Sequence, residues 1–595
     1  MNFSVAKIIL PVAINKSFDY KIPNSLKLKI GMRVLVDFNN KKRVGVISAF
    51  RNTSEIKINK LKTILSDLEN FPSISKEHLN FASILSKYYL YSQNEFVFMM
   101  LPQYLKKPRK IFFKEISIIK PQKDKFKRVF IKNDTFNKRY TFWKNIVAEE
   151  LEKGSVMILF PQISYLNYAR NILEKDFSDR ICILHSQQKE KELFLNWQNS
   201  RKRSLILGTR VAIFYYPLDL NLLIVEDENS PYYFQEEKPF YHLLELATLL
   251  SKFKKISLIL SADYPCLSTY KFILNGQIDF KDNLSANKKI EIVETKGSKI
   301  FSPLLVELIR KNLSDNKKIV LLWNKKGFAR VLYCNSCGYS FRCQYCSGFL
   351  HLLDVTTGIC SYCYRKQVIP KICLACNKGY IKGKGLGIQR LEAILKNIYP
   401  DVKIATLEDM TADTQIILAT SKILNFLYKD EFFDVGFLLD TDMFLSQPDY
   451  QATYDTFIYI NKLSYIFKDI LYVMTHNKNH YIFKNLLKWE EFYKEELQLR
   501  KQFDLPPYKK IADIIIRGKN KNKLSKRVEN LYNKLKQYKN VKVYGPLENY
   551  PPKLRGKFYY KLVIKSKSQI RLRQILKNEI EQLRASSFKI ALIIR

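Results

Sequence analysis

The N-terminal part of the chain alternates between apolar and polar positions. Short runs such as Lys7–Leu10 and Arg33–Val36 have this alternation, which is typical of β-strands with one buried face. Helical spacing of apolar residues follows only over residues 76–90. The pattern predicts a small β-rich domain over residues 1–105.

Continuous apolar runs separated by helical stretches replace this alternation from residue 126. Buried parallel strands are continuously apolar, because helices cover both faces of their sheet. Two such series predict two α/β lobes, over residues 126–300 and 301–500. After residue 501 short strands surround one expected helix, Leu524–Tyr538, which predicts a small α+β domain over 501–595. The expected lobe strands are Val129–Ile131, Val156–Phe160, Leu205–Leu207, Leu222–Val225 and Ser257–Leu260, then Lys318–Trp323, Gln415–Leu418, Val435–Leu439 and Ile470–Met474.

Eight of the ten cysteines form four Cys-x-x-Cys pairs inside the second lobe. These are Cys334/Cys337, Cys343/Cys346, Cys360/Cys363 and Cys373/Cys376. Eight thiolates fill two closed tetrahedral zinc sites, which are structural because no position remains for water. The spacing predicts a nested arrangement, in which the two inner pairs share one ion and the two outer pairs share the other. Disulfides or an iron–sulfur cluster are the alternatives; a large chain that starts without a secretory pattern favours zinc. A double-zinc module is therefore predicted over residues 334–376.

The chain is strongly basic, with 100 Lys and Arg against 56 Asp and Glu, a net charge of +44, and 13% of its residues are aromatic. Basic residues among aromatic ones suit single-stranded nucleic acid, since cations neutralise phosphates and rings stack on bases. Compositional drift toward lysine is the alternative reading of this charge. The chain has no apolar run as long as a membrane span, so we expect a cytoplasmic protein with no membrane partner.

Short motifs in a fixed order resemble one family. They are Leu10-Pro11, Phe18-Asp19-Tyr20, Lys29–Val36, Leu207–Arg210, Trp323–Ala329, Leu505–Tyr508 and Lys553–Lys557. In this order, around an eight-cysteine insertion, the chain resembles the primosomal protein N′ (PriA) family of bacterial replication-restart DNA helicases.

The resemblance implies a nucleoid-associated protein that recognises stalled or abandoned replication forks, binds branched and single-stranded DNA, and promotes reloading of the replicative helicase. Its implied partners are that helicase, its loading factors and single-stranded-DNA-binding protein. The two lobes would be RecA-like helicase lobes that use ATP and Mg²⁺.

The resemblance also implies a pocket for a DNA 3′ end in the first domain. The matching residues are Phe18, Asp19 and Lys62, and the family's glycine falls at Asn39. A winged-helix domain normally follows in the family, but here only a linker over residues 106–125 remains.

The nucleotide-binding loop departs from the family pattern. A phosphate-binding loop needs glycines, a lysine and a magnesium-binding hydroxyl. Lys138 matches the lysine, but no glycine remains and Arg139 replaces the hydroxyl residue. Phe136 would fill the phosphate space, and Asp134 would repel phosphate.

The other motor motifs are altered as well. Glu226-Asp227 stands where the family has Asp-Glu, which moves both carboxylates by a methylene. The terminal arginine motif matches residues 462–469, which contain no arginine. These changes predict an eroded ATPase that makes ATP and Mg²⁺ doubtful cofactors. An active ATP-dependent 3′–5′ helicase is the alternative, and a zinc-containing RNA-binding protein is a second one.

The residues of the first lobe that are expected to contact DNA match the family more closely than the nucleotide-binding motifs do. Thr209 and Arg210 suit phosphate binding through a backbone amide and a guanidinium. An aromatic loop follows, for which a packed core segment is the alternative reading to base stacking. Its proposed stacking residues are Tyr232, Tyr233, Phe234 and Tyr241.

Overall fold

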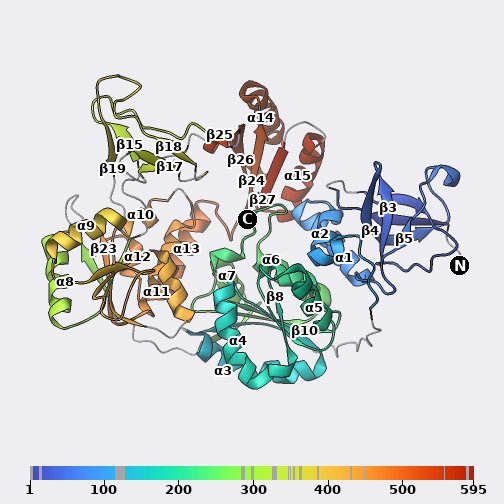
Figure 1. The fold of residues 1–595 in the computed structure, drawn as a ribbon, viewed down its shortest axis with the longest axis horizontal. Coiled ribbons are helices and arrows are strands. Elements are labelled where there is room, and N and C mark those ends of the chain that lie inside the picture. The colour runs from blue at the N-terminus through green and yellow to red at the C-terminus, as the bar shows by residue number, and fades with distance from the viewer. Residues whose placement is uncertain are drawn as a thin grey trace. The chain divides into compact units, whose positions relative to one another are not determined.

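The computed structural model divides the chain into two compact units, Met1–Leu284 and Ser285–Arg595 (Figure 1). It describes residues 4–12, 16–113, 127–133, 135–282, 289–295, 301–323, 331–345, 348, 350–352, 356–360, 363, 365–384, 388–428, 432–447, 449–554, 556–584 and 589–594. Within these ranges, the helices are all too short or too polar to cross a membrane.

The N-terminal domain is a five-stranded antiparallel sheet of order β2-β1-β4-β3-β5. Its strands are β1 (Val5–Ile9), β2 (Phe18–Lys21), β3 (Arg33–Phe38), β4 (Lys41–Arg51) and β5 (Ser66–Asp67). The β3–β4 turn holds Asn39 and Asn40 at φ values of 52° and 58°. Asparagine tolerates this left-handed region better than most residues. Asn39 therefore adopts a backbone conformation that also suits the glycine it replaces.

Two helices, α1 (Lys76–Tyr89) and α2 (Gln93–Met99), follow this sheet. Ser75 and Ser92 begin them with capping boxes, in which each serine accepts from a backbone N–H and the third helical side chain accepts in return. Apolar residues of both helices belong to the same buried cluster as lobe 1. The predicted boundary at residue 105 therefore does not separate two independent cores.

Lobe 1 is a seven-stranded parallel sheet of order β12-β6-β11-β10-β7-β9-β8. All five strands expected here from apolar runs are present. The strands are β6 (Arg128–Lys132), β7 (Ser155–Leu159), β8 (Ile181–Leu184), β9 (Leu205–Gly208), β10 (Leu220–Glu226), β11 (Ser257–Ala262) and β12 (Asp279–Asp282). The helices are α3 (Phe136–Lys153), α4 (Ile163–Phe177), α5 (Glu190–Asn199), α6 (Leu243–Lys254) and α7 (Leu267–Leu274).

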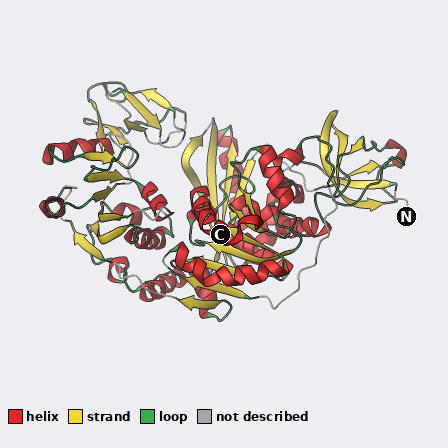
Figure 2. Cartoon of the chain, turned by 60° about the horizontal axis from the view of Figure 1, so that its bottom comes forward, coloured by secondary structure: helices red, strands yellow, loops and turns green. Residues whose placement is uncertain are grey.

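Lobe 2 is a six-stranded parallel sheet of order β13-β23-β22-β14-β21-β20. Its strands are β13 (Ile290–Glu294), β14 (Ile319–Leu322), β20 (Ile404–Thr406), β21 (Ile416–Ala419), β22 (Phe433–Leu438) and β23 (Phe467–Thr475). Its helices are α8 (Pro303–Ser314), α9 (Ile388–Ile398), α10 (Asp442–Leu445), α11 (Ala452–Ser464), α12 (Tyr481–Lys484) and α13 (Trp489–Gln502). Figure 2 shows helices against the strands of each lobe. The predicted pair of parallel α/β lobes is confirmed.

The predicted boundary between the lobes at residues 300 and 301 is wrong. Strand β13 pairs in parallel with β23, from Ile290 with Leu471 to Glu294 with Thr475, so lobe 2 already includes residue 290. This strand lies far in sequence from its partner, and its polar alternation hid it from a search for continuous apolar runs.

The cysteine module lies between β14 and α9 of lobe 2. Strands β15 (Val331–Cys334) and β19 (Ile381–Lys384) pair at its base, and β16 (Leu350–Leu352), β17 (Thr357–Cys360) and β18 (Lys366–Val368) form a small antiparallel sheet. The segments Asn324–Ala329 and Gly385–Gly387, which border it, lie outside the described residues.

The C-terminal domain is a four-stranded antiparallel sheet with two helices, in the order β–α–β–β–α–β. Its elements are β24 (Lys510–Gly518), α14 (Lys521–Lys536), β25 (Val541–Leu554), β26 (Lys557–Ser566), α15 (Gln569–Arg584) and β27 (Lys589–Ile594). The expected helix at Leu524–Tyr538 corresponds to α14. The predicted small α+β domain is confirmed.

Candidate functional site

The loop that matches a phosphate-binding loop lies at the carboxyl edge of the lobe 1 sheet, between β6 and α3. Thr135 caps α3, and its Oγ1 accepts a hydrogen bond from the Lys138 N–H at 3.4 Å. Phe136 is buried, with its ring centroid 5.9 Å from that of Trp143 and 5.6 Å from that of Tyr165. Asp134 lies outside the described residues. An aromatic cluster therefore packs at the start of the helix.

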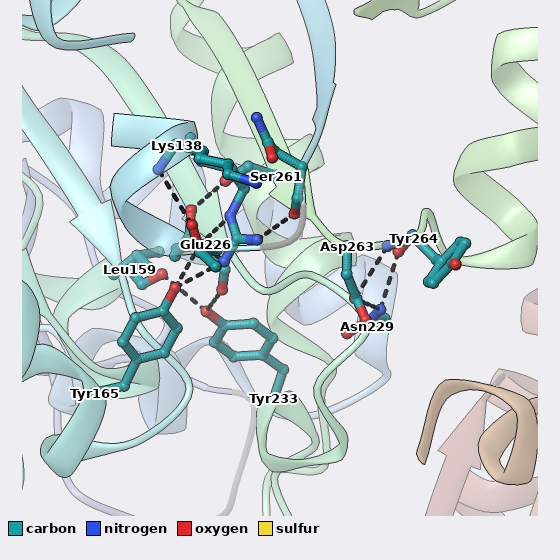
Figure 3. A network of polar contacts seen from close by, with 12 residues as sticks. Lys138, Leu159, Tyr165, Glu226, Asn229, Tyr233, Ser261, Asp263 and Tyr264 are labelled. Carbon is teal, nitrogen blue, oxygen red and sulfur yellow. Dashed lines mark hydrogen bonds and ion pairs between the residues drawn. The ribbon is translucent and has the colours of Figure 1, made fainter. Parts of the chain in front are cut away.

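Arg139 extends from α3 to Glu226 at the end of β10. Figure 3 shows Glu226 with Tyr165 and Ser261 beside it. Its Nε donates to Glu226 Oε1 at 2.6 Å, and its Nη2 lies 2.5 Å from the same oxygen. Its Nη1 donates to the backbone oxygen of Asn133 at 2.5 Å, and its Nη2 also donates to the Tyr165 hydroxyl at 2.9 Å. All three guanidinium nitrogens therefore have partners inside lobe 1.

Glu226 has partners on both oxygens. Oε1 also accepts from the Tyr165 hydroxyl at 2.6 Å, and Oε2 accepts from Ser261 Oγ on the neighbouring strand β11. The side chain is fully buried. The carboxyl ends of parallel strands meet at one sheet edge, which explains why residues distant in sequence join in one network.

Burial and the neighbouring charge have opposite effects on the pKa of Arg139. Burial by itself lowers the pKa of Arg139, but the adjacent charge of Glu226 and the Tyr165 hydroxyl raise it well above its ordinary value. The guanidinium is therefore a permanent cation beside the one carboxylate that the motif comparison assigns to magnesium. A buried acid already paired with a buried base has little remaining affinity for a second cation.

The other motif residues have different positions. Lys138 is exposed on the first turn of α3. Asp227 is buried and adopts a φ of 57°. Glu228 is buried and accepts from Cys266 N and Thr269 Oγ1, both at 2.8 Å, and its burial raises its pKa to about 8. Glu228 is thus directed toward α7.

Arg210 stabilises the aromatic loop from within the protein. Its Nη1 donates to the backbone oxygens of Tyr232 and Phe234, both at 2.6 Å. Thr209 is buried, and its N–H donates to Leu184 O at 3.1 Å. Both residues lie at the carboxyl edge of the sheet, where they hold the loop backbone.

The aromatic loop exposes only part of its predicted surface. Tyr232 is 57% exposed, and Phe234 is half-buried and stacks on Phe240 with centroids 6.5 Å apart. Tyr233 is fully buried, and its hydroxyl donates to Leu159 O at 2.8 Å and to Glu226 O. Tyr241 is 3% exposed. The predicted stacking role is therefore wrong for Tyr233 and Tyr241, whose rings belong to the core.

The three residues matched to the 3′-end pocket lie around β2 and the end of β3. The Phe18 ring packs edge-on against Phe38, with centroids 4.9 Å apart. Lys62 forms an ion pair with Asp37, and the hydrogen bond from Lys62 lowers the pKa of Asp37. Both contacts converge on the β3–β4 hairpin.

Asp19 has different neighbours from Phe18. Its Oδ2 accepts from Ser54 Oγ at 2.7 Å, and its Oδ1 lies 3.2 Å from Lys7 Nζ. Asp19 Oδ1 and Lys7 Nζ are therefore close enough for an ion pair. Their relative orientation does not meet the criteria for a hydrogen bond, and Oδ1 is buried. Phe18 and Asp19 are consecutive strand residues, so their side chains leave opposite faces of the sheet.

The cysteines gather as the nested spacing predicts. Cys334, Cys337, Cys373 and Cys376 form one cluster, and Cys343, Cys360 and Cys363 form the other, each with its sulfur atoms within 4.8 Å of one another. Cys346 lies outside the described residues. Both clusters can hold a metal ion.

Backbone geometry favours thiolates at Cys334 and Cys376 of the first cluster. The N–H groups of Ser336 and Cys337 donate to Cys334 Sγ at 3.4 Å. The N–H groups of Gly379 and Lys378 lower the pKa of Cys376 to about 6. A Cβ atom on Gly379 would lie 2.3 Å from Cys334 Sγ, so the turn that packs against this sulfur atom requires glycine at position 379. The donor set fits a four-thiolate metal site.

The segment that matches the terminal arginine motif runs from the end of α11 into β23. Leu463 and Ile466 are fully buried in lobe 2. Asp469 forms an ion pair with Lys317 at 2.8 Å. Apolar packing therefore occupies the segment that matches the family's terminal arginine motif.

Comparison with known proteins gives consistent matches from end to end. The model of the 3′ DNA-binding domain (3′BD) matches residues 7–102, and that of the primosomal protein N C-terminal domain matches residues 501–594. Curated proteins named replication restart protein PriA also match. Those of Rickettsia felis, Borreliella burgdorferi and Haemophilus influenzae are 26%, 25% and 22% identical; the alignments cover 98%, 98% and 96% of this chain and 98%, 96% and 96% of those proteins. With both terminal domains matched and relatives aligned along nearly the whole length, the chain belongs to the PriA family of replication restart proteins.

Proposed function

We propose that this chain is a replication restart protein that recognises stalled or abandoned forks through branched and single-stranded DNA and acts without ATP-driven unwinding. Membership of the family and its 3′ DNA-binding domain support the first part. The Arg139–Glu226 ion pair carries the second.

The residues present do not fit a magnesium nucleotide. A magnesium ion at Glu226 would have to displace a guanidinium that has partners on every nitrogen. Breaking a buried ion pair costs about 3–5 kcal/mol, because the group left behind is an uncompensated charge. No glycine in the loop brings backbone N–H groups to phosphates. Loss of an arginine finger alone lowers turnover by about 10³–10⁵.

DNA recognition is assigned to the N-terminal sheet and the aromatic loop. The DNA end would lie across the edge strand β2, where Phe18 would stack on the terminal base from one face and Asp19 would accept from the 3′-hydroxyl on the other. Lys62 would neutralise a phosphate. For this, Asp19 must exchange its contact with Ser54, and Lys62 its contact with Asp37, for DNA. Tyr232, the most exposed aromatic residue of the loop, would stack on an unpaired base.

The cysteine module is assigned two structural zinc ions. The four thiols of the outer cluster, with backbone N–H donors to sulfur, suit Zn²⁺. When bound, the ions cross-link short strands that have little core of their own. By family membership, the assigned protein partners are the replicative helicase, its loading factors and single-stranded-DNA-binding protein.

A fork-binding assay paired with an ATPase assay tests this function. Forks with a leading-strand 3′-hydroxyl at the junction should bind more tightly than forks with a 3′-phosphate, and more tightly than blunt duplexes of equal length. Phe18→Ala/Asp19→Asn should remove this preference but keep most of the affinity, which falls as salt rises. Phe272→Ala, an exposed phenylalanine in lobe 1, is the control.

Equal binding of all three DNAs would refute end recognition. ATP-dependent unwinding would establish the active helicase instead, and tighter binding of RNA than of forks would establish an RNA-binding protein.

A further inference from the structure

Residues 103–113, here named the bracket, contact both the N-terminal sheet and lobe 1. Most of this segment falls where the sequence predicts only a linker over residues 106–125; of that range, residues 114–125 lie outside the described residues. The bracket is one direct connection between the domain assigned to the DNA end and the lobe assigned to unpaired DNA.

The sheet side of the bracket is held by a buried ion pair. Arg33 of β3 and Glu69 are both fully buried, with Arg33 Nε 2.7 Å from Glu69 Oε2. Arg33 also donates through Nη1 to Leu105 O at 2.7 Å and through Nη2 to Arg109 O at 3.3 Å. A side chain of the sheet thus binds two bracket carbonyls from inside the protein.

Asn70 adds a second attachment on this side. Its amide donates to Phe113 O at 2.9 Å and accepts from Phe113 N at 2.7 Å. Between these two attachments, Ile111 N donates to Leu68 O at 2.9 Å. The bracket therefore continues the hydrogen bonding of the sheet domain.

The lobe side of the bracket packs on helix α5. Tyr104 stacks on Phe194 with centroids 4.8 Å apart, and Phe113 packs against Trp197 at 6.2 Å. The Arg201 guanidinium lies 5.4 Å from the Phe113 ring centroid and donates to Pro72 O at 3.3 Å. These rings belong to the buried core of lobe 1 or lie against it, so the bracket is an integral part of the lobe.

Helix α1 provides a second connection, which ends at the aromatic loop. His78 Nε2 contacts Tyr216 O at 3.1 Å, and the two rings stack at 4.4 Å. At the other end of the helix, Tyr89 packs edge-on against Tyr241, with centroids 6.5 Å apart. Tyr241 O in turn accepts from Gln235 N at 2.8 Å, at the base of the loop.

Helix α2 reaches the strand ends beside Phe18. Asn94 is 2% exposed and donates to Leu10 O at 3.0 Å and to Lys16 O at 3.1 Å. A chain of contacting residues therefore connects the strand ends near Phe18, through α2 and α1, to the loop that carries Tyr232.

We infer that the bracket and α1 hold the N-terminal sheet at a fixed position on lobe 1, so that the protein selects forks whose 3′ end lies at one set distance from the unpaired DNA. This inference rests on the proposed function, because it takes the sheet as the end site and Tyr232 as the single-strand site. Two sites on a rigid body bind a linked ligand best when the linker matches their separation, and affinity falls for shorter or longer linkers.

The test measures fork affinity while the single-stranded gap between the 3′ end and the junction grows by one nucleotide at a time. The full-length protein should show one optimum, with the gain in affinity lost when the gap is too short to span the two sites and about threefold weaker for each doubling of the gap beyond the optimum. Asn70→Ala/Tyr104→Ala loosens the bracket on both sides without leaving a buried charge. This variant should keep the 3′-hydroxyl preference and show a flat gap profile.

Phe272→Ala/Asn275→Ala is the matched control, because it removes an exposed phenylalanine from α7 and the exposed asparagine that follows this helix. It should reproduce the parent profile. A flat profile in the parent, or an unchanged optimum in the loosened variant, overturns the inference.

A DNA-free measurement separates this inference from the proposed function. Spin labels on non-natural amino acids at Lys42 and Arg170 avoid the cysteine clusters and report the separation between the sheet and lobe 1. The parent should give one narrow distance distribution, and the loosened variant a broad one. A broad parent distribution overturns the inference even if 3′ ends are preferred. A narrow distribution with no 3′-end preference overturns the proposed function, and with it the fork selection, but leaves the fixed position of the sheet on lobe 1.

Discussion

Arg139 and Glu226 form a buried ion pair with Nε–Oε1 and Nη2–Oε1 distances of 2.6 and 2.5 Å. The resemblance to the family leads us to expect a magnesium-binding hydroxyl at the first position and a magnesium-binding acid at the second. Under that expectation the arginine has two effects, because it provides no metal ligand and it supplies a cation that binds the remaining acid. Both side chains are buried in lobe 1.

The ion pair should contribute strongly to folding. Arg139→Ala leaves Glu226 buried without its partner, and we expect a loss of about 3–5 kcal/mol in the free energy of unfolding. Urea denaturation measures this loss. Arg170→Ala is the control, because the exposed Arg170–Glu174 pair on α4 should contribute at most about 1 kcal/mol. Equal losses in both variants would show that the buried pair has no special role.

ATP turnover should be negligible in the wild-type protein. Lys138 lies on the first turn of α3, next to the Arg139–Glu226 ion pair, so we expect no nucleotide phosphate to bind beside it. Lys138→Ala should leave phosphate release at background with and without DNA, and change only DNA affinity. DNA-stimulated release by the wild type that disappears in Lys138→Ala would contradict this prediction.

The sequence predicts the architecture well where the patterns are local. Continuous apolar runs such as Val156–Phe160 identify lobe strands, because a strand buried on both faces has no polar positions. Cys-x-x-Cys spacing identifies the nested clusters, because each pair has a fixed separation. Strand β13 could not be predicted in this way, because its apolar and polar residues alternate and it joins the lobe 2 sheet only by pairing with the distant strand β23.

The site was only partly predictable. Loss of the motif residues is readable in the sequence, but the partner of Arg139 is not, because Tyr165 and Glu226 join it through tertiary packing. The presence of an arginine at a hydroxyl position was the available signal. Likewise, aromatic composition cannot distinguish the exposed Tyr232 from the buried Tyr233, because the side chains of neighbouring loop residues point in different directions.

Stability of the first unit should depend on pH through His78. Burial lowers the pKa of His78 to about 3, so the fold keeps this imidazole neutral. A group with a lowered folded-state pKa adds stability above its unfolded value and loses it as pH falls, by up to about 1.4 kcal/mol per pH unit. We expect the unfolding midpoint in urea to fall between about pH 7 and pH 5. His78→Gln should flatten this slope and His476→Gln should not; an equal slope in all three proteins would rule out His78 as its source.

Metal content should be two zinc ions per chain. Cys343→Ser should release the inner ion, and Cys334→Ser the outer one, with elemental analysis as the measurement. Gly379→Ala should weaken the outer site alone, because its new Cβ would lie 2.3 Å from Cys334 Sγ. Gly338→Asn is the control, since open space surrounds that glycine and asparagine tolerates its φ of 71°. One zinc per chain, or the absorbance of an iron–sulfur cluster, would contradict the assignment.

Single-stranded DNA should contact the aromatic loop through Tyr232. Stacking on one base contributes about 1–3 kcal/mol, so Tyr232→Ala should weaken binding of a short single strand by that amount in a fluorescence anisotropy titration. Tyr233→Phe should leave DNA affinity nearly unchanged but lower stability, since it removes the hydroxyl that donates to Leu159 O. Tyr339→Ala controls for loss of an exposed tyrosine elsewhere. Because Arg210 binds the carbonyls on both sides of Tyr233, Arg210→Ala should weaken binding only while Tyr232 is present. An additive loss in the double variant would instead mean that Arg210 binds phosphate directly.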